Sequence, residues 1–458
     1  MRVLICGAGQ VGFNIARYLA AEDADITVVD RRPDLIRKIQ DQLDVQAVVG
    51  HAAHPQTLEQ AGAATADMMI AVTPTDEVNM VACQVAHSLF KVPTKIARVR
   101  SQSYLSPIWA NLYSRENMPI DVIISPEYEV AQSITRLLEV PGALDVIPLC
   151  NDKVRLIGAR TTTSCPILNT PLRQLSQLFP ELSITILGII RDERAWVPTG
   201  DDVMQPGDDV YFITETSKTQ RALAVFGHEE HLSNRVVIFG GGNIGLALAQ
   251  NLEDHPLSFN SKIIEMDEGR AEFAAKTLSS TVVIHGDALD SEILEEAGVK
   301  TSDTVVAITD SDETNILASL LAKRHGVSRA ITLTNKPDFG RLVSHLGIDT
   351  AINPRDITVS TILQHVRRGR IHSVHAIHEG FGELIEADAL ETSELVGKSI
   401  RSASLPHGVL LGAIVRDGKV IIPRGNTTVH AGDRVVLFAD ADSIRKAEKL
   451  FAVRLTYI

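Results

Sequence analysis

The sequence predicts an α/β protein with two parallel-sheet domains, each followed by a small α+β module. Three observations support this fold class. First, short apolar runs alternate with amphipathic stretches of helical length. Second, a glycine-rich turn spaced G-x-G-x-x-G occurs at residues 7–12 and again at residues 240–245. Third, shorter motifs follow each of these turns in the same order. Alternating strands and helices indicate βαβ units with right-handed crossovers, and therefore two Rossmann-like parallel sheets.

The first glycine-rich turn joins an expected strand at residues 3–5 to an amphipathic helix that begins near Val11. In this spacing the first glycine makes a tight turn, the second lets backbone approach a pyrophosphate, and the third packs helix against strand. The N–H groups at the start of the helix then bind the anion, although close packing alone is the alternative interpretation of such a turn. The expected phosphate cradle consists of Gly7, Ala8, Gly9, Gln10 and Val11.

The following elements keep the order of a dinucleotide-binding domain. We expect strands at residues 25–30, 45–49, 67–72 and 94–99 and helices at residues 11–21, 33–42, 55–61 and 76–90. The second strand ends at Asp30, about 20 residues after the glycines, where such folds place a carboxylate that accepts from ribose hydroxyls. This carboxylate would repel a 2′-phosphate, which favours NAD over NADP. The adjacent Arg31 and Arg32 complicate that preference, since arginines can bind a 2′-phosphate.

Further candidate contacts lie just after the other expected strands, because ligands of open α/β sheets bind at the carboxyl ends of the strands. His51 follows the third strand, Thr73 and Pro74 close the fourth, and Arg98 and Arg100 lie at the end of the fifth. Alternate residues of a strand share a face, so both arginines would lie together. If that face is the cleft, Arg98 can neutralise a phosphate; if not, the pair lies on a solvated surface.

The second half of the chain repeats the first. Gly50-His-Ala recurs as Gly286-Asp-Ala, Leu58-Glu-Gln-Ala-Gly as Leu294-Glu-Glu-Ala-Gly, and Asn79 as Asn315, all at one constant offset. Such a regular repeat indicates gene duplication.

The repeat predicts a second nucleotide site at the second glycine turn. Its expected residues are Gly240, Gly241, Gly242, Asn243 and Ile244, with Glu265 at the acidic position and Asp287 in the place of His51. The fifth strand of this half reads Ile-Thr-Leu-Thr at residues 331–334, so threonines are expected where the first half has its two arginines. We therefore expect the two halves to differ in affinity or in preferred ligand.

Each Rossmann-like half is followed by short alternating strands, separated by Pro, Gly and Asp turns and closed by a helix. These regions predict α+β modules of roughly 80 residues, a size that often depends on pairing for a sufficient core. The expected limits are a first Rossmann domain at residues 1–118, a crossover helix region at 119–140, a first small module at 141–227, a second Rossmann domain at 233–350, a crossover helix region at 351–370 and a second small module at 371–453.

Composition argues against several other classes of protein. The 458 residues carry a net charge of −13, which disfavours a general nucleic-acid surface, and the basic trio Arg367, Arg368 and Arg370 is expected to be a solvated helix end. No run of about eighteen apolar residues predicts a membrane span, and the N-terminus does not resemble a signal peptide. Four scattered cysteines without metal-binding spacing suit a reducing cytosol.

Three histidines are the strongest candidates for a metal site, but we predict none. His372, His375 and His378 recur every three residues just after an expected helix, where a strand should begin. In a strand this spacing does not place all three side chains on one face, so no metal ligand set is expected.

The duplicated pairing of glycine turn and small module resembles the RCK (KTN) family, which regulates potassium channels and transporters. More specific marks are Gly50-His-Ala-Ala-His-Pro55, the stretch at residues 75–86, Ile96-Ala-Arg-Val-Arg100, and a Gly-Asp pair at residues 207–208 and 432–433. The resemblance implies two RCK N-type and two RCK C-type halves that bind NAD(H) and, in some members, ATP or ADP.

The same resemblance implies where the protein acts and with what. It implies a cytoplasmic subunit, peripheral to the inner face of the cell membrane, that forms a homo-oligomeric ring, expected as a homotetramer. Its expected partner is a TrkH-like membrane potassium transporter subunit whose activity it sets. Regulation through nucleotide binding, with no catalytic residues, is the function that follows from the resemblance.

An NAD-dependent oxidoreductase is the main alternative. Such an enzyme needs a substrate domain that presents an acid or base beside the nicotinamide. Each Rossmann-like half is followed only by a small β-rich module, and neither Tyr-x-x-x-Lys nor Gly-x-Ser-x-Gly occurs. A scaffold with empty nucleotide folds is a third possibility, and it would make Asp30 and Glu265 incidental. The duplicated cofactor fold without a substrate domain favours a sensor over an enzyme.

Overall fold

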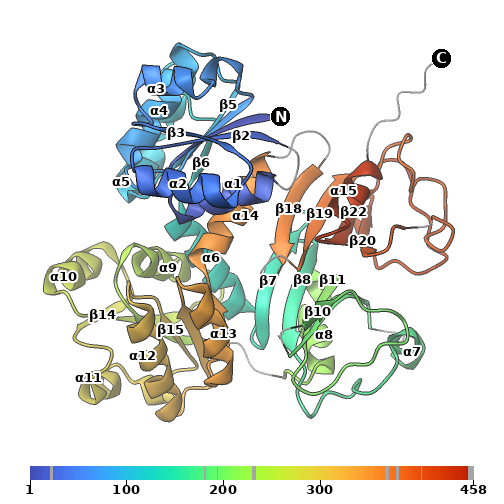
Figure 1. Ribbon diagram of the computed structural model, residues 1–458. Coiled ribbons are helices and arrows are strands. Elements are labelled where there is room, and N and C mark those ends of the chain that lie inside the picture. The colour runs from blue at the N-terminus through green and yellow to red at the C-terminus, as the bar shows by residue number, and fades with distance from the viewer. Residues whose placement is uncertain are drawn as a thin grey trace, which may run out of the picture. The chain divides into compact units, whose positions relative to one another are not determined.

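The computed structural model describes residues 1–20, 24–179, 182–192, 194–229, 234–366, 371–377, 381–403 and 405–451. The chain divides into two compact units. The first consists of residues 1–131, 334–337 and 353–366, and the second of residues 132–333, 338–352 and 367–458. Together they contain two parallel and two antiparallel sheets, which confirms the predicted fold class (Figure 1).

The first unit holds a six-stranded parallel sheet of order β3-β2-β1-β4-β5-β6. Its strands are β1 (Arg2–Cys6), β2 (Asp25–Asp30), β3 (Gln46–Val49), β4 (Met68–Ala71), β5 (Thr94–Arg98) and β6 (Val122–Ile124). The helices between them are α1 (Gln10–Ala20), α2 (Pro33–Gln42), α3 (Pro55–Gln60), α4 (Asp76–Ser88) and α5 (Gln102–Leu105), with short 3₁₀ segments at Ala63–Thr65 and Pro107–Tyr113. The expected elements end within one or two residues of these limits. Because strand order reverses between β1 and β4, the glycine turn after β1 lies at the switch point where such sheets bind ligands.

The apolar sequence of β1 explains its central place. Val3 and Ile5 belong to the core on one face of the sheet, and Leu4 and Cys6 to the core on the other. A parallel strand covered on both faces needs this continuous apolar run. One face is covered by α1 and also by α14 (Pro354–Val366). In the sequence α14 follows the last strand of the second Rossmann-like sheet, yet its apolar residues join the core of the first sheet.

The second unit contains the second Rossmann-like sheet, of order β14-β13-β12-β15-β16-β17. Its strands are β12 (Arg235–Phe239), β13 (Asn260–Glu265), β14 (Val282–His285), β15 (Thr304–Ala307), β16 (Arg329–Leu333) and β17 (Thr350–Ile352). Its helices are α9 (Asn243–Glu253), α10 (Glu268–Thr277), α11 (Ser291–Glu296), α12 (Asp312–Arg324) and α13 (Pro337–His345), with a 3₁₀ segment at Val299–Thr301. The strand order is that of the first sheet, as the sequence repeat predicts.

The helix α6 (Pro126–Glu139), which follows the first sheet, ends against the second one. The buried guanidinium of Arg329 donates from Nη1 to the carbonyl oxygen of Leu137 at 2.7 Å and from Nη2 to that of Ala143 at 2.6 Å. His255 Nε2 lies 3.0 Å from Glu139 Oε1. Each Rossmann-like sheet is therefore bound by a helix that belongs, in sequence, to the other half of the chain.

The two small modules both lie in the second unit and are five-stranded antiparallel sheets, of order β10-β9-β11-β8-β7 and β18-β19-β22-β20-β21. The first has β7 (Ala143–Leu149), β8 (Val154–Arg160), α7 (Leu172–Leu178), β9 (Ile184–Arg191), β10 (Arg194–Trp196), β11 (Asp209–Glu215), a 3₁₀ segment at Thr216–Lys218 and α8 (Thr219–Val225). The second has β18 (Ile371–Ile377), β19 (Gly382–Asp388), β20 (Val409–Arg416), β21 (Lys419–Ile421), β22 (Arg434–Asp440) and α15 (Ile444–Lys449).

These modules share one apolar core, which includes Leu156 and Ile213 of the first and Leu384 and Phe438 of the second. Glycine permits the close approach, since a Cβ at Gly188 would overlap the ring of Phe381. Pairing thus adds a shared core, and the second module also has a separate apolar cluster of its own.

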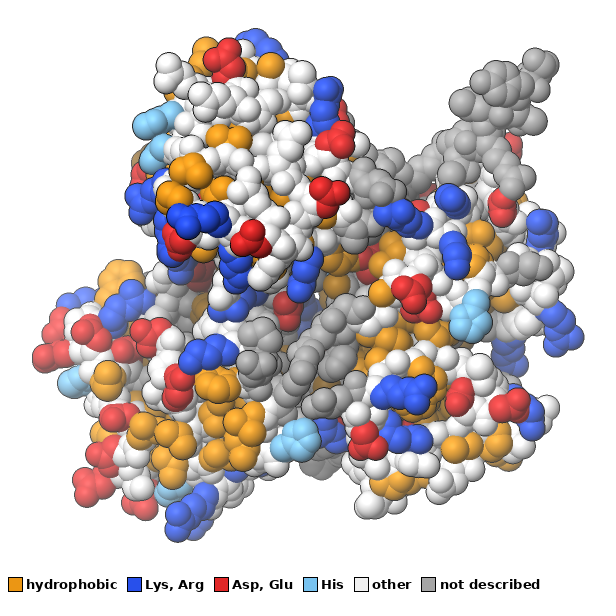
Figure 2. All heavy atoms as spheres, viewed as in Figure 1, with side chains coloured by type: hydrophobic (Ala, Val, Ile, Leu, Met, Phe, Trp, Pro, Cys, Tyr) orange, Lys and Arg blue, Asp and Glu red, His pale blue; other side chains and the backbone are white. Residues whose placement is uncertain are grey.

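The structure also bears on the expectations about membrane spans, metal sites and surface charge. Among the described residues, no helix combines the length and apolar character that crossing a bilayer requires. No metal-binding group of three His, Cys, Asp or Glu occurs in the part of the chain that the structure describes. His372 and His375 lie on β18, whereas His378 and the basic trio at residues 367, 368 and 370 lie outside the described residues. Figure 2 shows acidic and basic side chains mixed over the visible face of each unit.

Candidate functional site

The first glycine turn is shaped by contacts that only glycine permits. Gly7 has φ +113°, and a Cβ there would lie 3.0 Å from the backbone nitrogen of Thr73. A Cβ on Gly12 would overlap the carbonyl oxygen of Gly7, so this glycine lets α1 approach β1. Gly9 differs, because nothing lies within 4 Å of its Cβ position. The turn therefore leaves open space beside Gly9 and the first N–H groups of α1, at Gln10 and Val11, which is the arrangement that holds a phosphate.

Asp30 fixes the turn from the end of β2. Its Oδ2 accepts from the N–H of Ala8 at 2.7 Å and its Oδ1 from the N–H of Arg32 at 2.9 Å. A carboxylate has about four acceptor positions, so it retains capacity for a ribose hydroxyl. The carbonyl of Asp30 also accepts from Gly50 N–H at 2.9 Å, which brings the end of β3, and His51 after it, to the same edge.

His51 is held in place at that edge by its neighbours in the chain. Its Nδ1 accepts from the N–H of Ala53 at 3.3 Å, and its ring stacks on that of His54 with centroids 4.6 Å apart. These contacts fix the ring after β3, and contact between His51 and a ligand stays a prediction.

Thr73 and Arg98 form the opposite edge, after β4 and at the end of β5. Arg98 Nη2 donates to the carbonyl oxygen of Thr73 at 2.9 Å, and Pro74 follows in the segment that leads to α4. Burial lowers the pKa of Arg98, and the neighbouring Arg100 lowers it further. Arg98 Nε is buried and has no hydrogen-bond partner among the described residues. A buried cationic N–H without a partner is costly, and an anionic ligand would satisfy it.

Asn79 positions this edge, although the sequence showed only that it is repeated. It is fully buried, and its Oδ1 accepts from the N–H and the hydroxyl of Thr73 at 2.8 and 2.7 Å. Its Nδ2 donates to the carbonyl oxygens of Thr73 and Arg98 at 3.1 and 2.9 Å. One amide thus joins the ends of β4 and β5.

The prediction that Arg98 and Arg100 share a strand face is wrong. β5 ends at Arg98, and the chain then turns so that the N–H of Arg100 donates to Asp76 Oδ2 at 2.9 Å. The guanidinium of Arg100 pairs with Glu127, with Nε 2.7 Å from Oε1. This arginine is bound to the start of α6, and Arg98 alone remains at the ligand edge.

The second glycine turn repeats the first. Gly240 has φ +107°, a Cβ on Gly245 would overlap the carbonyl oxygen of Gly240, and nothing lies within 4 Å of the Cβ position of Gly242. Glu265 Oε2 accepts from the N–H of Gly241 at 2.6 Å. Asn243 and Ile244 begin α9.

Asp287 lies beside Glu265 in the second half. The carbonyl of Glu265 accepts from Gly286 N–H at 2.9 Å, which brings the end of β14 to the turn. Asp287 Oδ1 accepts from the N–H of Leu289 at 2.9 Å, so part of its acceptor capacity serves its own loop.

The distal edge of the second half differs by one residue from the prediction. Ala71 pairs with Ala97 and Ala307 with Thr332, so the counterpart of Arg98 is Leu333 and not a threonine. Leu333 is buried, and Asn315 Nδ2 donates to its carbonyl oxygen at 3.1 Å. This edge therefore lacks the arginine, as expected, but the residue expected at the position of Arg98 was wrong, because it is a leucine and not a threonine.

Arg270 contacts the second glycine turn, and this contact was not predicted from the sequence. From the first turn of α10, its Nη2 lies 3.2 Å from the carbonyl oxygen of Gly241 and 3.2 Å from Asn243 Oδ1. The available signal was an arginine soon after the acidic strand end, which in such folds lies near the ribose.

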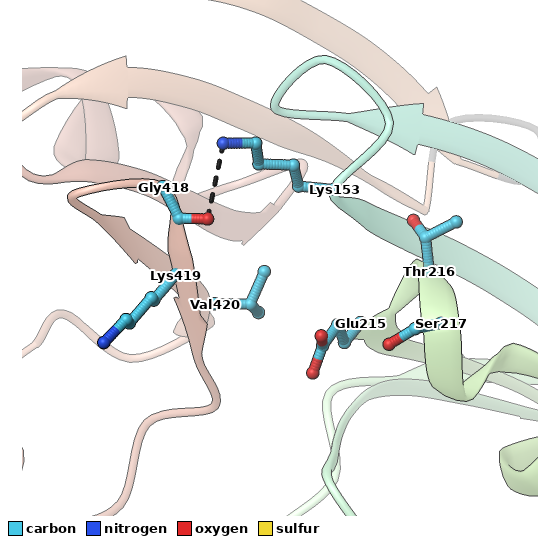
Figure 3. Close-up of a pocket in the computed structure, with 7 residues that line it drawn as sticks. All are labelled: Lys153, Glu215, Thr216, Ser217, Gly418, Lys419 and Val420. Atoms are coloured by element: carbon cyan, nitrogen blue, oxygen red, sulfur yellow. Dashed lines mark hydrogen bonds between the residues drawn. The ribbon is translucent and has the colours of Figure 1, made fainter.

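A separate cavity of about 420 Å³ lies between the two small modules (Figure 3). Lys153 Nζ crosses from the first module to the carbonyl oxygen of Gly418 in the second at 3.3 Å. Lys419 and Glu215 line the same cavity, and Glu215 pairs with Lys218 at 2.9 Å. Its charges are of both signs, and they do not indicate one ligand class.

The fold and the two turns define a tandem RCK protein, in which two Rossmann-like domains each carry a small antiparallel module. Residues 3–126 and 236–354 match the TrkA-N domain, and residues 156–227 and 384–452 match the TrkA-C domain. The chain belongs to the TrkA family of Trk system potassium uptake proteins.

Relatives from three bacteria illustrate the family. The Trk system potassium uptake protein TrkA of Azorhizobium caulinodans is 51% identical and that of Halomonas elongata 42%, each over the full length of both chains. The protein of the same name from Vibrio alginolyticus is 39% identical over 96% of this chain and 95% of its own.

Solved structures share the fold at low identity. The crystal structure of the GsuK RCK domain has a TM-score of 0.60 at 18% identity, over 98% of this chain and 94% of that one. The GsuK channel bound to NAD has a TM-score of 0.59 at 16% identity, over 98% of this chain and 78% of that one. GsuK bound to ADP has a TM-score of 0.50 at 15% identity, over 80% and 69% of the two chains.

Proposed function

We propose that this chain is a cytoplasmic regulatory subunit of a potassium uptake transporter that binds NAD(H), ATP or ADP and gates a membrane partner allosterically. Membership of a family whose relatives are named potassium uptake proteins supports the role in potassium transport. The GsuK channel, which shares the fold, has been solved with NAD and with ADP, which supports these ligand classes.

The observation that carries the proposal is the open space beside Gly9, bordered by an acid on one side and a cation on the other. Asp30 would accept from the adenosine ribose, and Gly9, Gln10 and Val11 would face the phosphates. The unsatisfied Nε of Arg98 would then meet the distal part of the ligand. Gly242 and Glu265 would repeat the first two roles in the second half.

A ligand that touches both edges offers a physical route to regulation. It would join the β1–α1 turn to the ends of β4 and β5, and it would favour whichever arrangement of the domains keeps these parts together. Only a difference in affinity between two arrangements can shift their populations. We propose that the shift acts through a homotetrameric ring on a TrkH-like transporter subunit at the inner face of the membrane.

Calorimetric titration of the full chain with NADH, NAD and ATP tests this function. We expect binding to the wild type, and at least tenfold weaker binding to the first half in Asp30→Ala and to the second in Glu265→Ala. Asp34→Ala is the matched control, because Asp34 pairs with exposed Arg32 and does not touch the turn. Absence of binding to the wild type would refute the sensor, whereas substrate-dependent oxidation of NADH at 340 nm would favour the oxidoreductase.

A further inference from the structure

We propose that the second Rossmann-like half selects an adenosine nucleotide with a short phosphate chain, AMP or ADP, and that Arg270 binds its phosphate. This inference rests on the proposed function and adds a ligand preference for each half. It follows from the different positions of one arginine side chain in each half, Arg98 in the first and Arg270 in the second.

Arg270 is held beside the second glycine turn from two directions. Its backbone N–H donates to Asp267 Oδ1 at 2.8 Å, and the N–H of Asp267 donates to Glu265 Oε1 at 2.9 Å. Its guanidinium reaches Gly241 and Asn243, whose neighbour Gly242 faces open space. Gly241 thus has its N–H bound by Glu265 and its carbonyl bound by Arg270. The cation is fixed next to the space that a phosphate would occupy.

The guanidinium keeps donors for a ligand. Arginine has five N–H donors, and within the described residues its hydrogen bonds to the turn use only Nη2. Nη1 and Nε can therefore donate to a phosphate, and a planar guanidinium suits a bidentate contact of this kind. Arg270 would also offset the charge of Glu265, which would otherwise repel an anion beside Gly241.

The first half has no counterpart at this position. The third residue of α2 is Leu35, where the third residue of α10 is Arg270. The side chain of Arg32 pairs with Asp34 instead of reaching the turn. The cation of the first half is Arg98, bound to Thr73 at the distal edge. The two halves therefore present positive charge at opposite ends of the ligand space.

This difference leads to different preferred ligands. In the first half, a ligand gains by extending its phosphate charge from the turn to Arg98, as a triphosphate does. In the second half buried Leu333 occupies the position of Arg98, so within the described residues a longer phosphate chain does not meet the counterpart of that arginine. Charge close to the adenosine is matched by Arg270, which favours AMP and ADP.

Calorimetry on the full-length chain with AMP, ADP and ATP separates the two sites. We expect Arg270→Gln to weaken AMP and ADP binding about tenfold, which corresponds to about 1.4 kcal/mol, and to leave ATP binding to the first half unchanged. Arg98→Gln should weaken ATP binding to the first half and leave AMP binding unchanged. Arg270→Lys should recover part of the lost affinity, because it restores the charge without the planar fork.

A merely structural role of Arg270 gives a different result. If it only clamps the turn, Arg270→Gln lowers the melting temperature of the ligand-free chain and keeps its AMP affinity. That result, or equal weakening of AMP and ATP binding, overturns the inference while the proposed function stands. If no nucleotide binds the wild type, the proposed function itself fails.

Discussion

Asn79 holds Thr73 through three hydrogen bonds, accepting from its N–H and hydroxyl and donating to its carbonyl. Asn315 repeats all three bonds on Thr309, at 2.8, 2.7 and 3.1 Å. Both amides also donate to the last residue of the next strand, which is Arg98 in one half and Leu333 in the other. Duplication has thus kept the scaffold of this edge, whereas the charge that the edge presents has changed.

Replacement of Asn79 by leucine should destabilise the first unit and weaken nucleotide binding there. The change removes the acceptor of the Thr73 N–H and a donor to the carbonyl of Arg98, and each buried unsatisfied group costs about 1–3 kcal/mol. We expect a loss of about 2–4 kcal/mol in urea unfolding. Asn117→Leu is the control, since Asn117 is exposed and its side-chain amide donates to the carbonyl of Asn111 in its own loop. Equal losses in the two variants would show that the edge does not depend on Asn79.

Much of the fold could be predicted from periodicity and glycine spacing. Gly7, Gly12, Gly240 and Gly245 lie where a side chain would collide with backbone, so the sequence signal reports a steric requirement. The destination of α14 could not be predicted in this way. Its pattern indicates that a face is buried, but the sheet that covers that face depends on how the whole chain is arranged.

The candidate sites were predicted less completely, because side-chain direction depends on where a strand ends. Because β5 ends at Arg98, this residue stays at the carboxyl edge of the sheet, whereas Arg100 lies beyond the strand and turns toward Glu127. The role of Arg270 could not be predicted from the repeat, because its counterpart in the first half is the apolar residue Leu35. A charged side chain that contacts a site from a neighbouring helix lies outside the sequence motif that predicts the site.

Gly12 and Gly9 of the first turn should respond differently to alanine. Gly12→Ala places a Cβ against the carbonyl oxygen of Gly7 and should cost about 1–3 kcal/mol of stability through overpacking. Gly9→Ala meets nothing within 4 Å, so it should leave the melting temperature unchanged and weaken nucleotide binding by filling the phosphate space. Thermal unfolding and calorimetry of both variants measure the two effects. Stable Gly9→Ala protein with wild-type affinity would contradict the placement of the phosphate.

Arg329 should be essential to the attachment of α6 to the second sheet. Arg329→Met keeps much of the buried volume but removes the two donors to Leu137 and Ala143, which should cost about 2–4 kcal/mol. Guanidinium chloride unfolding measures the loss. Arg235→Met is the matched control, because Arg235 forms a largely exposed pair with Asp303 at 2.6 Å that should contribute less than about 1 kcal/mol.

Glu253 should make the second Rossmann-like domain sensitive to acid. Burial raises its pKa, but backbone N–H groups of Ser279, Ser280 and Thr281 outweigh burial and bring the pKa from 4.5 down to about 2. Their donor–acceptor distances to Oε1 are 3.1, 2.7 and 2.7 Å. A carboxyl whose folded pKa is depressed stabilises the fold fully above its unfolded pKa and loses that contribution as pH falls toward the folded value. The contribution should therefore be complete near neutral pH and decline between about pH 4.5 and pH 2.

Glu253→Gln tests this sign. At neutral pH the variant should be less stable than the wild type, because it removes the charge and sets an amide NH₂ against backbone donors. As the pH is lowered from 4.5, the difference should shrink, since the wild type takes up the proton that the variant lacks. Urea midpoints between pH 7 and pH 3 measure the difference, with Glu272→Gln as the control, because Glu272 pairs only with exposed Lys276 on its own helix. A difference between Glu253→Gln and wild type that stays constant over this range would show that the carboxylate charge does not contribute.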